Sequence, residues 1–357
     1  MRITLSKCLF QALERTFLTS DNFQLSTFCF PTGVEALRVK TSRQELIILP
    51  FLGQQIWSAS VDGRAIGMTS AVRYPKRNVS LLENLGGFFF HCGLTAIAAP
   101  GEGDGHPLHG ELPNAELDEA WIDIGEDAKA LSIGGSFEYA RAFGAHYRFS
   151  PSIAFSAADP SFNINVEVEN LRHAPMELCY LGHVNFRPID GSKLIYTAPY
   201  TKDAVKVRSA IPAHLKPSAQ YLQLLSELEA EPSRHHQISH TVAYDPEIVF
   251  RVNYLADEDG WAHGLQIHPN GIADWIAHRP EQLPHAFRWI SRSSDQQTLA
   301  ITEPATCGID GYSKEKQHGR IPELAALGTW RATMRVGQLD ADRVEAMQSR
   351  IDAICGR

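Results

Sequence analysis

Histidine and glutamate side chains in three short segments of the chain could carry out acid–base chemistry or bind a metal ion. A histidine titrates close to neutral pH, and a carboxylate in a suitable environment can exchange protons in the same range. In each segment a titratable group lies near glycine or proline, where the backbone turns sharply and a side chain can project into a concave face. The segments are residues 84–110 with His106 and His109, residues 180–188 with His183 and Asn185, and residues 283–308 with Trp289 and Glu303.

Taken singly, these groups differ in how strongly they indicate a function. His109 precedes Gly110 and could be a turn residue, and His183 could be a core histidine bonded to a backbone carbonyl. Glu303 directly follows the apolar run 299–302 and precedes a proline, so its carboxylate is expected at the end of a buried strand. An unpaired charge there would be costly, and buried carboxylates usually have a partner or a catalytic role. Glu303 is therefore the strongest candidate from residue type and position alone.

Composition and missing motifs argue against several functional classes. The formal net charge is −8 over 357 residues, whereas nucleic-acid binding needs a concentrated basic surface. The chain contains no G-x-x-x-x-G-K-[ST] phosphate loop and no G-x-S-x-G nucleophile elbow. Residues 101–106 are rich in glycine but carry acidic groups, which favours a surface loop. His235, His236 and His240 lie in a polar stretch and are predicted to be solvated.

The chain also lacks signals for a membrane or for export. Its apolar runs are far shorter than the roughly 20 residues that cross a bilayer, and its first residues show no apolar core or cleavage site of a signal peptide. The six cysteines are scattered without any paired spacing, which is typical of isolated thiols in a reducing cytosol. We therefore predict a cytoplasmic protein with no membrane or nucleic-acid partner.

Alternation of apolar and polar residues predicts an all-β, predominantly antiparallel sandwich. Residues 162–169 and 330–336 alternate with the period of two that a strand with one buried face requires. Turn-forming residues separate many further short strands, and helical intervals are few, which argues against a parallel α/β sheet. The further strands are expected at residues 34–39, 45–49, 55–61, 143–149, 152–156, 178–180, 248–254, 263–268 and 298–301.

Helical patterning is limited to two places. Apolar residues every three or four positions between 344 and 354 predict an amphipathic C-terminal helix that begins near Asp342. Asp342 and Glu345 have the spacing of a capping box at its start. A second helix is predicted over residues 218–229, with Ser218 as its N-cap.

A single domain is the better interpretation of the remaining pattern. The polar stretch 201–246 contains three prolines and looks like a long excursion at the rim of the fold rather than a linker between domains. The chain shows no internal repeat, no run of five like charges and no low-complexity segment. We predict one β-sandwich domain over residues 31–357, preceded by an appended segment, residues 1–30.

Together the three segments resemble the galactose mutarotase-like, or aldose 1-epimerase, superfamily. They are most similar to a branch described only as an aldose 1-epimerase-like domain of unknown function. The resemblance covers roughly residues 33–340, and its pieces occur in the expected order. They are Cys92-Gly-Leu after a glycine pair, Leu108-His-Gly, His183-Val-Asn-Phe, Leu283-Pro with the following Trp289, and Glu303-Pro-Ala-Thr. This resemblance implies a carbohydrate-binding β-supersandwich with an open concave sheet.

The resemblance also implies a reaction and the residues that perform it. The family interconverts the α and β anomers of a free aldose by opening and closing the sugar ring, without a metal or another cofactor. His183 matches the general acid that protonates the ring oxygen, and Glu303 matches the general base that takes the anomeric hydroxyl proton. His109 matches a second histidine that helps to hold the sugar. Further contacts with the sugar would come from Trp289, Asn185 and Arg73.

This assignment predicts a geometry. The ring oxygen and the anomeric oxygen share one carbon and lie about 2 Å apart, so the carboxylate and the imidazole should converge within about 5 to 8 Å. Two positions depart from the family pattern: Glu111 replaces a common arginine, and His91 replaces a small hydroxyl residue. If Glu111 faces the pocket, its charge would disfavour an anionic sugar.

Two alternatives remain open at this point. The first is a metal-dependent sugar isomerase or lyase, in which His106, His109, His183 and Glu303 would be the metal ligands. The second is a sugar-binding protein without catalytic activity. In every case the expected partner is a small-molecule sugar, and a homodimer is left open.

Overall fold

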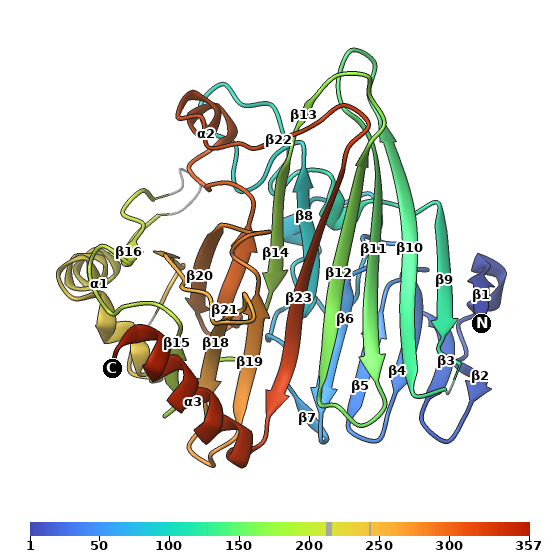
Figure 1. Cartoon of the computed structure of the whole chain (residues 1–357), viewed down its shortest axis with the longest axis horizontal. Coiled ribbons are helices and arrows are strands. Elements are labelled where there is room, and N and C mark those ends of the chain that lie inside the picture. The colour runs from blue at the N-terminus through green and yellow to red at the C-terminus, as the bar shows by residue number, and fades with distance from the viewer. Residues whose placement is uncertain (127, 212–215, 243) are drawn as a thin grey trace.

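Two large antiparallel sheets make up most of the chain in the computed structural model, which describes residues 1–126, 128–211, 216–242 and 244–357 (Figure 1). Within these residues the smaller sheet has nine strands, in the order β1 (Arg2–Leu5), β9 (Glu119–Ile124), β10 (Ala130–Ala140), β11 (His146–Ser156), β12 (Ser161–Asn170), β23 (Thr329–Leu339), β19 (Ala273–His278), β18 (Ala262–Ile267) and β15 (Lys193–Tyr196). The larger sheet has twelve strands in the same described ranges. Eleven follow the order β16 (Val205–Val207), β17 (Ile248–Val252), β20 (His285–Arg292), β21 (Gln297–Ala305), β14 (Cys179–Val184), β8 (Phe89–Leu94), β6 (Ile56–Val61), β5 (Gln44–Ile48), β4 (Glu35–Lys40), β3 (Gln24–Cys29) and β2 (Arg15–Thr19), and β7 (Arg64–Ala65) pairs with β6. The predicted all-β sandwich is confirmed.

Short elements complete the fold. The strands β13 (Met176–Glu177) and β22 (Glu323–Leu324) pair with each other. The α-helices of the described ranges are α1 (Ala219–Ala230), α2 (Tyr312–Gln317) and α3 (Ala341–Cys355), and the 3₁₀ helices are η1 (Lys7–Leu9), η2 (Leu81–Glu83), η3 (Leu112–Asn114) and η4 (Pro232–His236). In the part of the chain that the structure describes, no helix is both long and apolar enough to cross a membrane.

The main hydrophobic core lies between the two sheets and draws side chains from both. The strand β12 shows how the sequence builds it, because its apolar residues at alternate positions from 162 to 168 are buried while the polar residues between them are half-buried. β12 pairs with β23 in register, with Val166 opposite Ala332. The two most regular amphipathic segments of the sequence are therefore neighbours in one sheet, although they are far apart in the chain.

The strands predicted at 143–149 and 152–156 form one strand, β11, instead of two. Phe143 is exposed, with φ of 60°, and lies in the turn before the strand, which begins at His146. Pro151 lies within β11, where the pairing with β10 skips it and only β12 is opposite. A proline has no N–H to donate, so it fits a strand only at such an unpaired position.

Both predicted helices are present, but the expected cap of the C-terminal helix was wrong. The N-cap of α1 is Ser218, whose side-chain oxygen accepts a hydrogen bond from the Tyr221 N–H at 3.1 Å, as predicted. The N-cap of α3 is Asp340, two residues before Asp342, and its carboxylate accepts hydrogen bonds from Arg43 instead of from the helix N-terminus.

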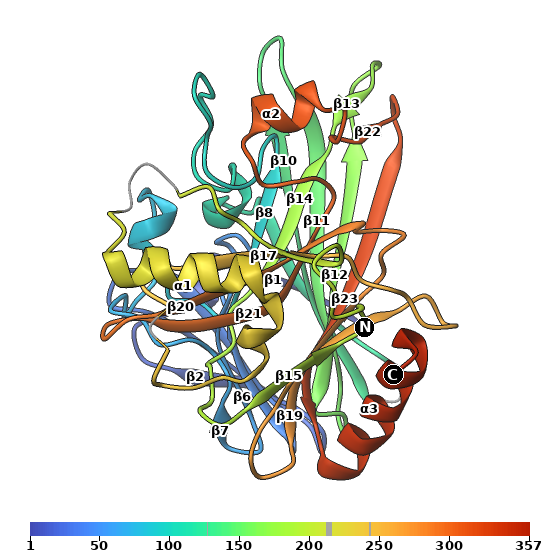
Figure 2. The same ribbon diagram turned by 90° about the vertical axis from the view of Figure 1, so that its left-hand side faces the viewer.

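The polar stretch 201–246 lies beside the edge of the larger sheet. It contributes the edge strand β16 and the helix α1, which Figure 2 shows alongside the sheet; residues 212–215 and 243 of this stretch lie outside the described residues. The prediction of solvated histidines was wrong for His235, which is fully buried because its ring stacks on Phe250 and its Nε2 lies 2.6 Å from Arg288 Nη1.

Residues 1–30 supply strands to both sheets. The strand β1 pairs with β9 in the smaller sheet, and β2 and β3 extend the larger sheet next to β4. Hydrogen bonds along β3 and β4 thus continue the sheet across the expected domain boundary. The division of the chain at residue 30 stays a prediction.

Candidate functional site

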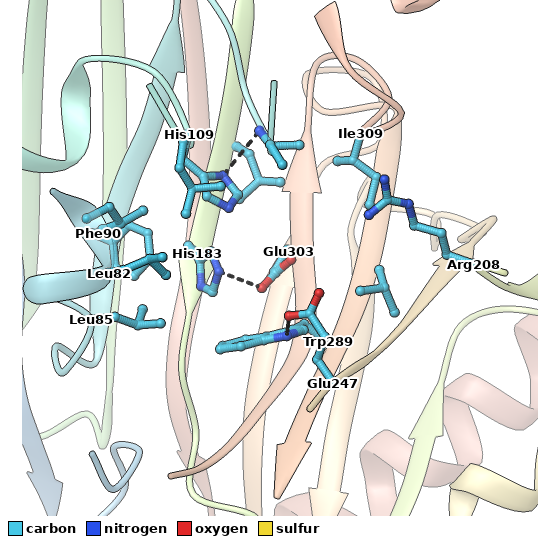
Figure 3. A pocket seen from close by; sticks show the side chains of 16 residues that line it. Leu82, Leu85, Phe90, His109, His183, Arg208, Glu247, Trp289, Glu303 and Ile309 are labelled. Carbon is cyan, nitrogen blue, oxygen red and sulfur yellow. Dashed lines mark hydrogen bonds and ion pairs between the residues drawn. The ribbon is translucent and has the colours of Figure 1, made fainter. Parts of the chain in front are cut away.

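Three of the residues singled out in the sequence, His109, His183 and Glu303, come together on one face of the larger sheet. Side chains alternate along a strand, so on β14 Tyr180 points into the main core whereas His183 points to the opposite face. The outward-facing side chains line a pocket of about 120 Å³. Its walls are Leu81, Leu82, Leu85, Phe90, Ala98, Ala99, Leu108, Leu181, Val249 and Ile309, and its polar groups are His109, His183, Arg208, Glu247, Trp289 and Glu303 (Figure 3).

The order of strands in the larger sheet explains this convergence. His183 lies on β14, Glu303 on the neighbouring β21, and Trp289 on β20 beside it. Gly182 lets the two sheets approach each other next to His183, because a Cβ at this position would lie 2.6 Å from the Cε of Met334. The rigid core strands thus fix the positions of the two titratable side chains.

His183 and Glu303 contact each other directly (Figure 3). The His183 Nε2 lies 3.2 Å from the Glu303 Oε1, and each residue is only 5% exposed. The expected distance for two groups on either side of a sugar was about 5 to 8 Å. The observed distance is shorter, and the two side chains are in direct contact in the pocket. The carboxylate that sequence analysis placed at the end of a buried strand therefore has a titratable partner.

Burial shifts the pKa values of both partners toward their neutral forms. It raises the pKa of the Glu303 carboxyl well above its ordinary value, and the nearby Glu247 carboxylate raises it further. Burial also lowers the pKa of His183 well below its ordinary value; His109 adds to this effect, and the nearby Asn185 side chain opposes it. Both shifts favour the neutral forms, in which Glu303 carries the carboxyl proton and the His183 imidazole is uncharged.

His109 enters the pocket from a turn. Its φ is 60°, and the following Gly110 has φ of 76°. The Ala98 N–H donates a hydrogen bond of 3.4 Å to His109 Nδ1, so the other ring nitrogen of the neutral imidazole carries the hydrogen. Burial lowers the pKa of His109 to about 4, with His106 adding to the effect. His109 can therefore present an Nε2–H donor, and its ring centroid lies 5.4 Å from that of His183.

Aromatic rings hold the His183 imidazole on two sides. The Phe90 ring stacks on it with centroids 4.3 Å apart, and the Trp289 ring meets it edge-on at 5.2 Å. The Trp289 Nε1–H donates a hydrogen bond of 2.7 Å to Glu247 Oε2. Packing and this bond fix the indole, which presents an apolar surface to the pocket.

Two of the predicted sugar contacts do not line the pocket. Asn185 is fully buried, and its Nδ2–H donates a hydrogen bond of 3.0 Å to the Gly87 carbonyl oxygen. Its amide lies close to His183, so it can orient the imidazole but does not reach the pocket surface. Arg73 lies on an exposed loop, where its charge is solvated, and is not among the lining residues. Neither Asn185 nor Arg73 lines the pocket, and their contacts with a sugar stay a prediction.

The two departures from the family pattern also face away from the pocket. The Glu111 carboxylate accepts hydrogen bonds from the Thr95 N–H at 3.1 Å and the Tyr147 hydroxyl at 2.5 Å, so it ties down the loop after β8. His91 points into the main core, where its Nδ1 lies 2.8 Å from the Tyr180 hydroxyl oxygen. The charge of Glu111 therefore gives no argument against an anionic sugar.

The described residues offer no set of ligands for the metal-dependent alternative. Among these residues no group of three or more histidine, cysteine, aspartate or glutamate side chains is placed to hold a metal ion. His106 would be a ligand in that alternative, but it does not line the pocket; its Nδ1 lies 2.8 Å from the Pro107 carbonyl oxygen and its Nε2 lies 3.9 Å from Asp104.

Sequence reasoning missed Glu247 and Arg208. Glu247 follows a proline and directly precedes the apolar strand 248–252, so it had a signal like that of Glu303, a carboxylate at the end of a buried strand. Arg208 lies just after the edge strand β16, and nothing in the local sequence distinguishes it from a surface arginine. Of the two, only Arg208 could not be recognised from the sequence.

Comparisons with known proteins agree on the fold. A family model described as a domain of unknown function, DUF4432, matches residues 31–337. No curated protein matches the chain significantly. The structure of a candidate aldose 1-epimerase from Klebsiella pneumoniae is 19% identical, with a TM-score of 0.80 over 94% of this chain and 88% of that chain. Galactose mutarotase-like proteins from Clostridium acetobutylicum and Lactobacillus casei are 11% and 10% identical, with TM-scores of 0.60 and 0.56; they cover 90% and 85% of this chain, which covers 100% of each of them. The chain therefore has the galactose mutarotase-like fold that its sequence resemblance predicted.

Proposed function

The chain belongs to the DUF4432 family, and we propose that it is a carbohydrate isomerase of the aldose 1-epimerase type. The observation that carries this proposal is the buried contact of 3.2 Å between His183 and Glu303 on the wall of the pocket. Shifted pKa values at a buried pair beside a pocket are typical of acid–base sites. We call this pocket the catalytic pocket from here on.

The pair suits the two proton transfers of ring opening. An aldose ring opens when one proton leaves the anomeric hydroxyl and one reaches the ring oxygen. His183 and Glu303 hold one proton between them, so the protonated partner can serve the ring oxygen while the other takes the hydroxyl proton. Closure on the other face of the aldehyde reverses both transfers, and the pair returns to its starting state. The reaction therefore works whichever partner starts with the proton.

The walls of the catalytic pocket match the other surfaces of a sugar. The Trp289 indole and the Phe90 ring offer apolar faces to sugar C–H groups. His109 can donate a hydrogen bond through Nε2, Glu247 can accept one, and Arg208 can donate several. A pocket with apolar walls and a few fixed polar groups is typical of small-molecule sites.

The first test replaces the carboxyl by an amide of the same shape. We expect Glu303→Gln to lower kcat for anomer exchange by at least about 10²-fold, because a positioned acid or base typically contributes about 10² to 10⁴. Saturation-transfer NMR on a panel of free aldoses measures the exchange. Glu167→Gln is the matched control, since Glu167 is a half-buried carboxylate on the smaller sheet, paired with Arg331.

The same experiment separates the alternatives. A non-catalytic sugar-binding protein would bind sugars without enhancing exchange, and Glu303→Gln would then change only affinity. A metal-dependent enzyme would lose activity after dialysis against a chelator and regain it with added metal, whereas the proposed mechanism needs no metal. A cytoplasmic location and a homodimer stay predictions.

A further inference from the structure

A second groove continues the catalytic pocket toward the edge of the larger sheet. It has a volume of about 380 Å³ and shares Arg208, Val249 and Ile309 with the catalytic pocket. Alternate side chains of a strand face the same way. Glu247, just before β17, lines the pocket, Val249 lines both the pocket and the groove, and Arg251 lines the groove. Two residues of a strand span about 7 Å, which is on the scale of one sugar ring.

Cationic side chains dominate this groove, although the whole chain has a net charge of −8. These side chains are Lys206, Arg208, Arg251 and Lys314, and we call the site the cationic groove. Among the described lining residues the single carboxylate is that of Asp310. It lies 3.7 Å from Arg208 Nε and 3.6 Å from Arg320 Nη2, so its charge is already shared.

Most of these cations form no ion pair with the residues that the structure describes, although the charge of Arg251 acts on the nearby Glu315 carboxylate. In the described ranges, no ion pair forms with Lys206, Arg251 or Lys314. The nearby Glu315 carboxylate is bound by Arg320, whose Nε lies 2.6 Å from Glu315 Oε2. Like charges collected in a groove repel each other and concentrate a positive potential there. An anion that binds among them would relieve this repulsion.

We propose that the cationic groove binds an anionic substituent of the sugar, so that the substrate is an aldose with a phosphate or carboxylate group remote from its anomeric carbon. This inference rests on the proposed function, which places the anomeric carbon between His183 and Glu303. Arginine offers a planar fork of N–H donors to carboxylate or phosphate oxygens, and lysine adds a compact charge. Arg208 lies at the junction of pocket and groove and can contact both parts of such a substrate.

The first test compares sugars that differ only in charge. Anomer exchange is measured for a neutral aldose, its 6-phosphate and the corresponding uronate with the wild-type protein. We expect at least about tenfold higher kcat/KM for one or both anionic sugars, and a decrease of this advantage at high salt. The phosphate and carboxylate arms identify which anion is preferred. Equal kcat/KM for the neutral and both anionic sugars would overturn the proposal.

The second test assigns the preference to the groove. We expect Arg251→Gln to raise KM for the preferred anionic sugar about tenfold with little change in kcat, so that the ratio of anionic to neutral kcat/KM falls. Arg331→Gln is the matched control, because it removes the same charge from an exposed ion pair with Glu167 on the smaller sheet. An equal effect of the two variants would show that net charge, not the groove, sets the preference.

A binding measurement keeps this inference separate from the proposed function. Titration of the wild-type protein with inorganic phosphate should show binding that weakens at least about fivefold in Arg251→Gln but not in Arg331→Gln. Exchange of neutral sugars without an anionic preference would refute the inference alone. Phosphate binding at the groove without exchange of any sugar would instead refute the isomerase function.

Discussion

In the proposed mechanism the His183–Glu303 pair needs one proton, and this requirement sets the pH dependence. Below the pKa of His183, which lies well below its ordinary value, the pair gains a second proton and has no base. Above the pKa of Glu303, which lies well above its ordinary value, the pair loses its acid. We therefore expect a bell-shaped profile of kcat/KM, with an acid limb below the ordinary histidine range and an alkaline limb above the ordinary glutamate range.

The Glu247 carboxylate provides the control for this profile. Because it raises the pKa of Glu303, Glu247→Gln should shift the alkaline limb to lower pH and leave the acid limb in place. Measuring kcat/KM against pH for both proteins tests this shift. A profile that rises near pH 4.5 and stays flat at alkaline pH would contradict a shared proton, since it would require an ionised Glu303 throughout.

At the scale of residues, the sequence indicated the titratable side chains of the site better than it indicated the residues that surround them. Glu303 could be predicted because a carboxylate after an apolar strand is costly unless it has a role. For His183 and His109 the residues alone left a structural role open, and the family resemblance favoured a functional one. Arg73 does not line the catalytic pocket, because the face of a loop does not follow from local periodicity. Glu247 was missed although, like Glu303, it lies at the end of a buried strand.

At the scale of elements, the turn at His109 depends on Gly110. A Cβ at Gly110 would lie 2.6 Å from the Gly93 carbonyl oxygen, in a backbone with φ of 76°. We expect Gly110→Ala to lower the free energy of unfolding by about 2 to 4 kcal/mol, through backbone strain and this contact, and to lower kcat/KM because His109 moves. Gly33→Ala is the control, since Gly33 has φ of 82° but nothing within 4 Å of its Cβ position.

Urea unfolding and anomer exchange measure the two effects. Gly33→Ala should lower the free energy of unfolding by only about 1 kcal/mol and leave exchange unchanged, because it adds strain without a clash and lies outside the catalytic pocket. Equal losses of stability in both variants would mean that the contact with Gly93 contributes nothing.

Element boundaries were predictable where a local rule decided them and not where a distant residue did. Ser218 caps α1 through its own neighbour, so the sequence identified it. Asp340 is the N-cap of α3, two residues before Asp342, and its carboxylate is bound to Arg43, nearly three hundred residues away in the chain. Pro151 looked like a strand break, but the skipped pairing with β10 accommodates it. These outcomes reflect tertiary contacts that local patterns do not encode.

At the scale of the molecule, alternation identified the sandwich but not its strand order. The period of two in β12 and β23 showed that each has one buried face, yet nothing in either segment specified the other as its neighbour. The same strand order makes β14 and β21 neighbours at the catalytic pocket. A register shift of one residue in β14 or β21 would turn the side chain of His183 or Glu303 into the core.

The core of this sandwich buries histidines, and they make its stability depend on pH. His91 and His278 are almost fully buried, and burial lowers the pKa of each from its ordinary value of 6.5 to about 3. Between these values the unfolded chain binds a proton at each position and the folded chain does not. Stability is therefore present above pH 6.5 and is lost as the pH falls toward 3. Glu303 acts in the opposite direction, because its pKa is raised in the folded state.

We expect these two histidines to lower the free energy of unfolding by about 4 kcal/mol between pH 7 and pH 5, about 2 kcal/mol each, and the lowered pKa values of His109 and His183 add to this loss. This loss is a large part of the 5 to 15 kcal/mol typical of folded proteins, so unfolding by acid should begin near pH 5, above the range in which ordinary carboxylates titrate. Urea unfolding at both pH values measures the difference, and His91→Gln should reduce it by about 2 kcal/mol because glutamine takes up no proton. His240→Gln should not change it, since the His240 side chain is 76% exposed in the folded state. If His91→Gln leaves the difference unchanged, the folded core accommodates a protonated imidazole at this position. The 2.8 Å contact between His91 Nδ1 and the Tyr180 hydroxyl does not by itself explain such a protonated state.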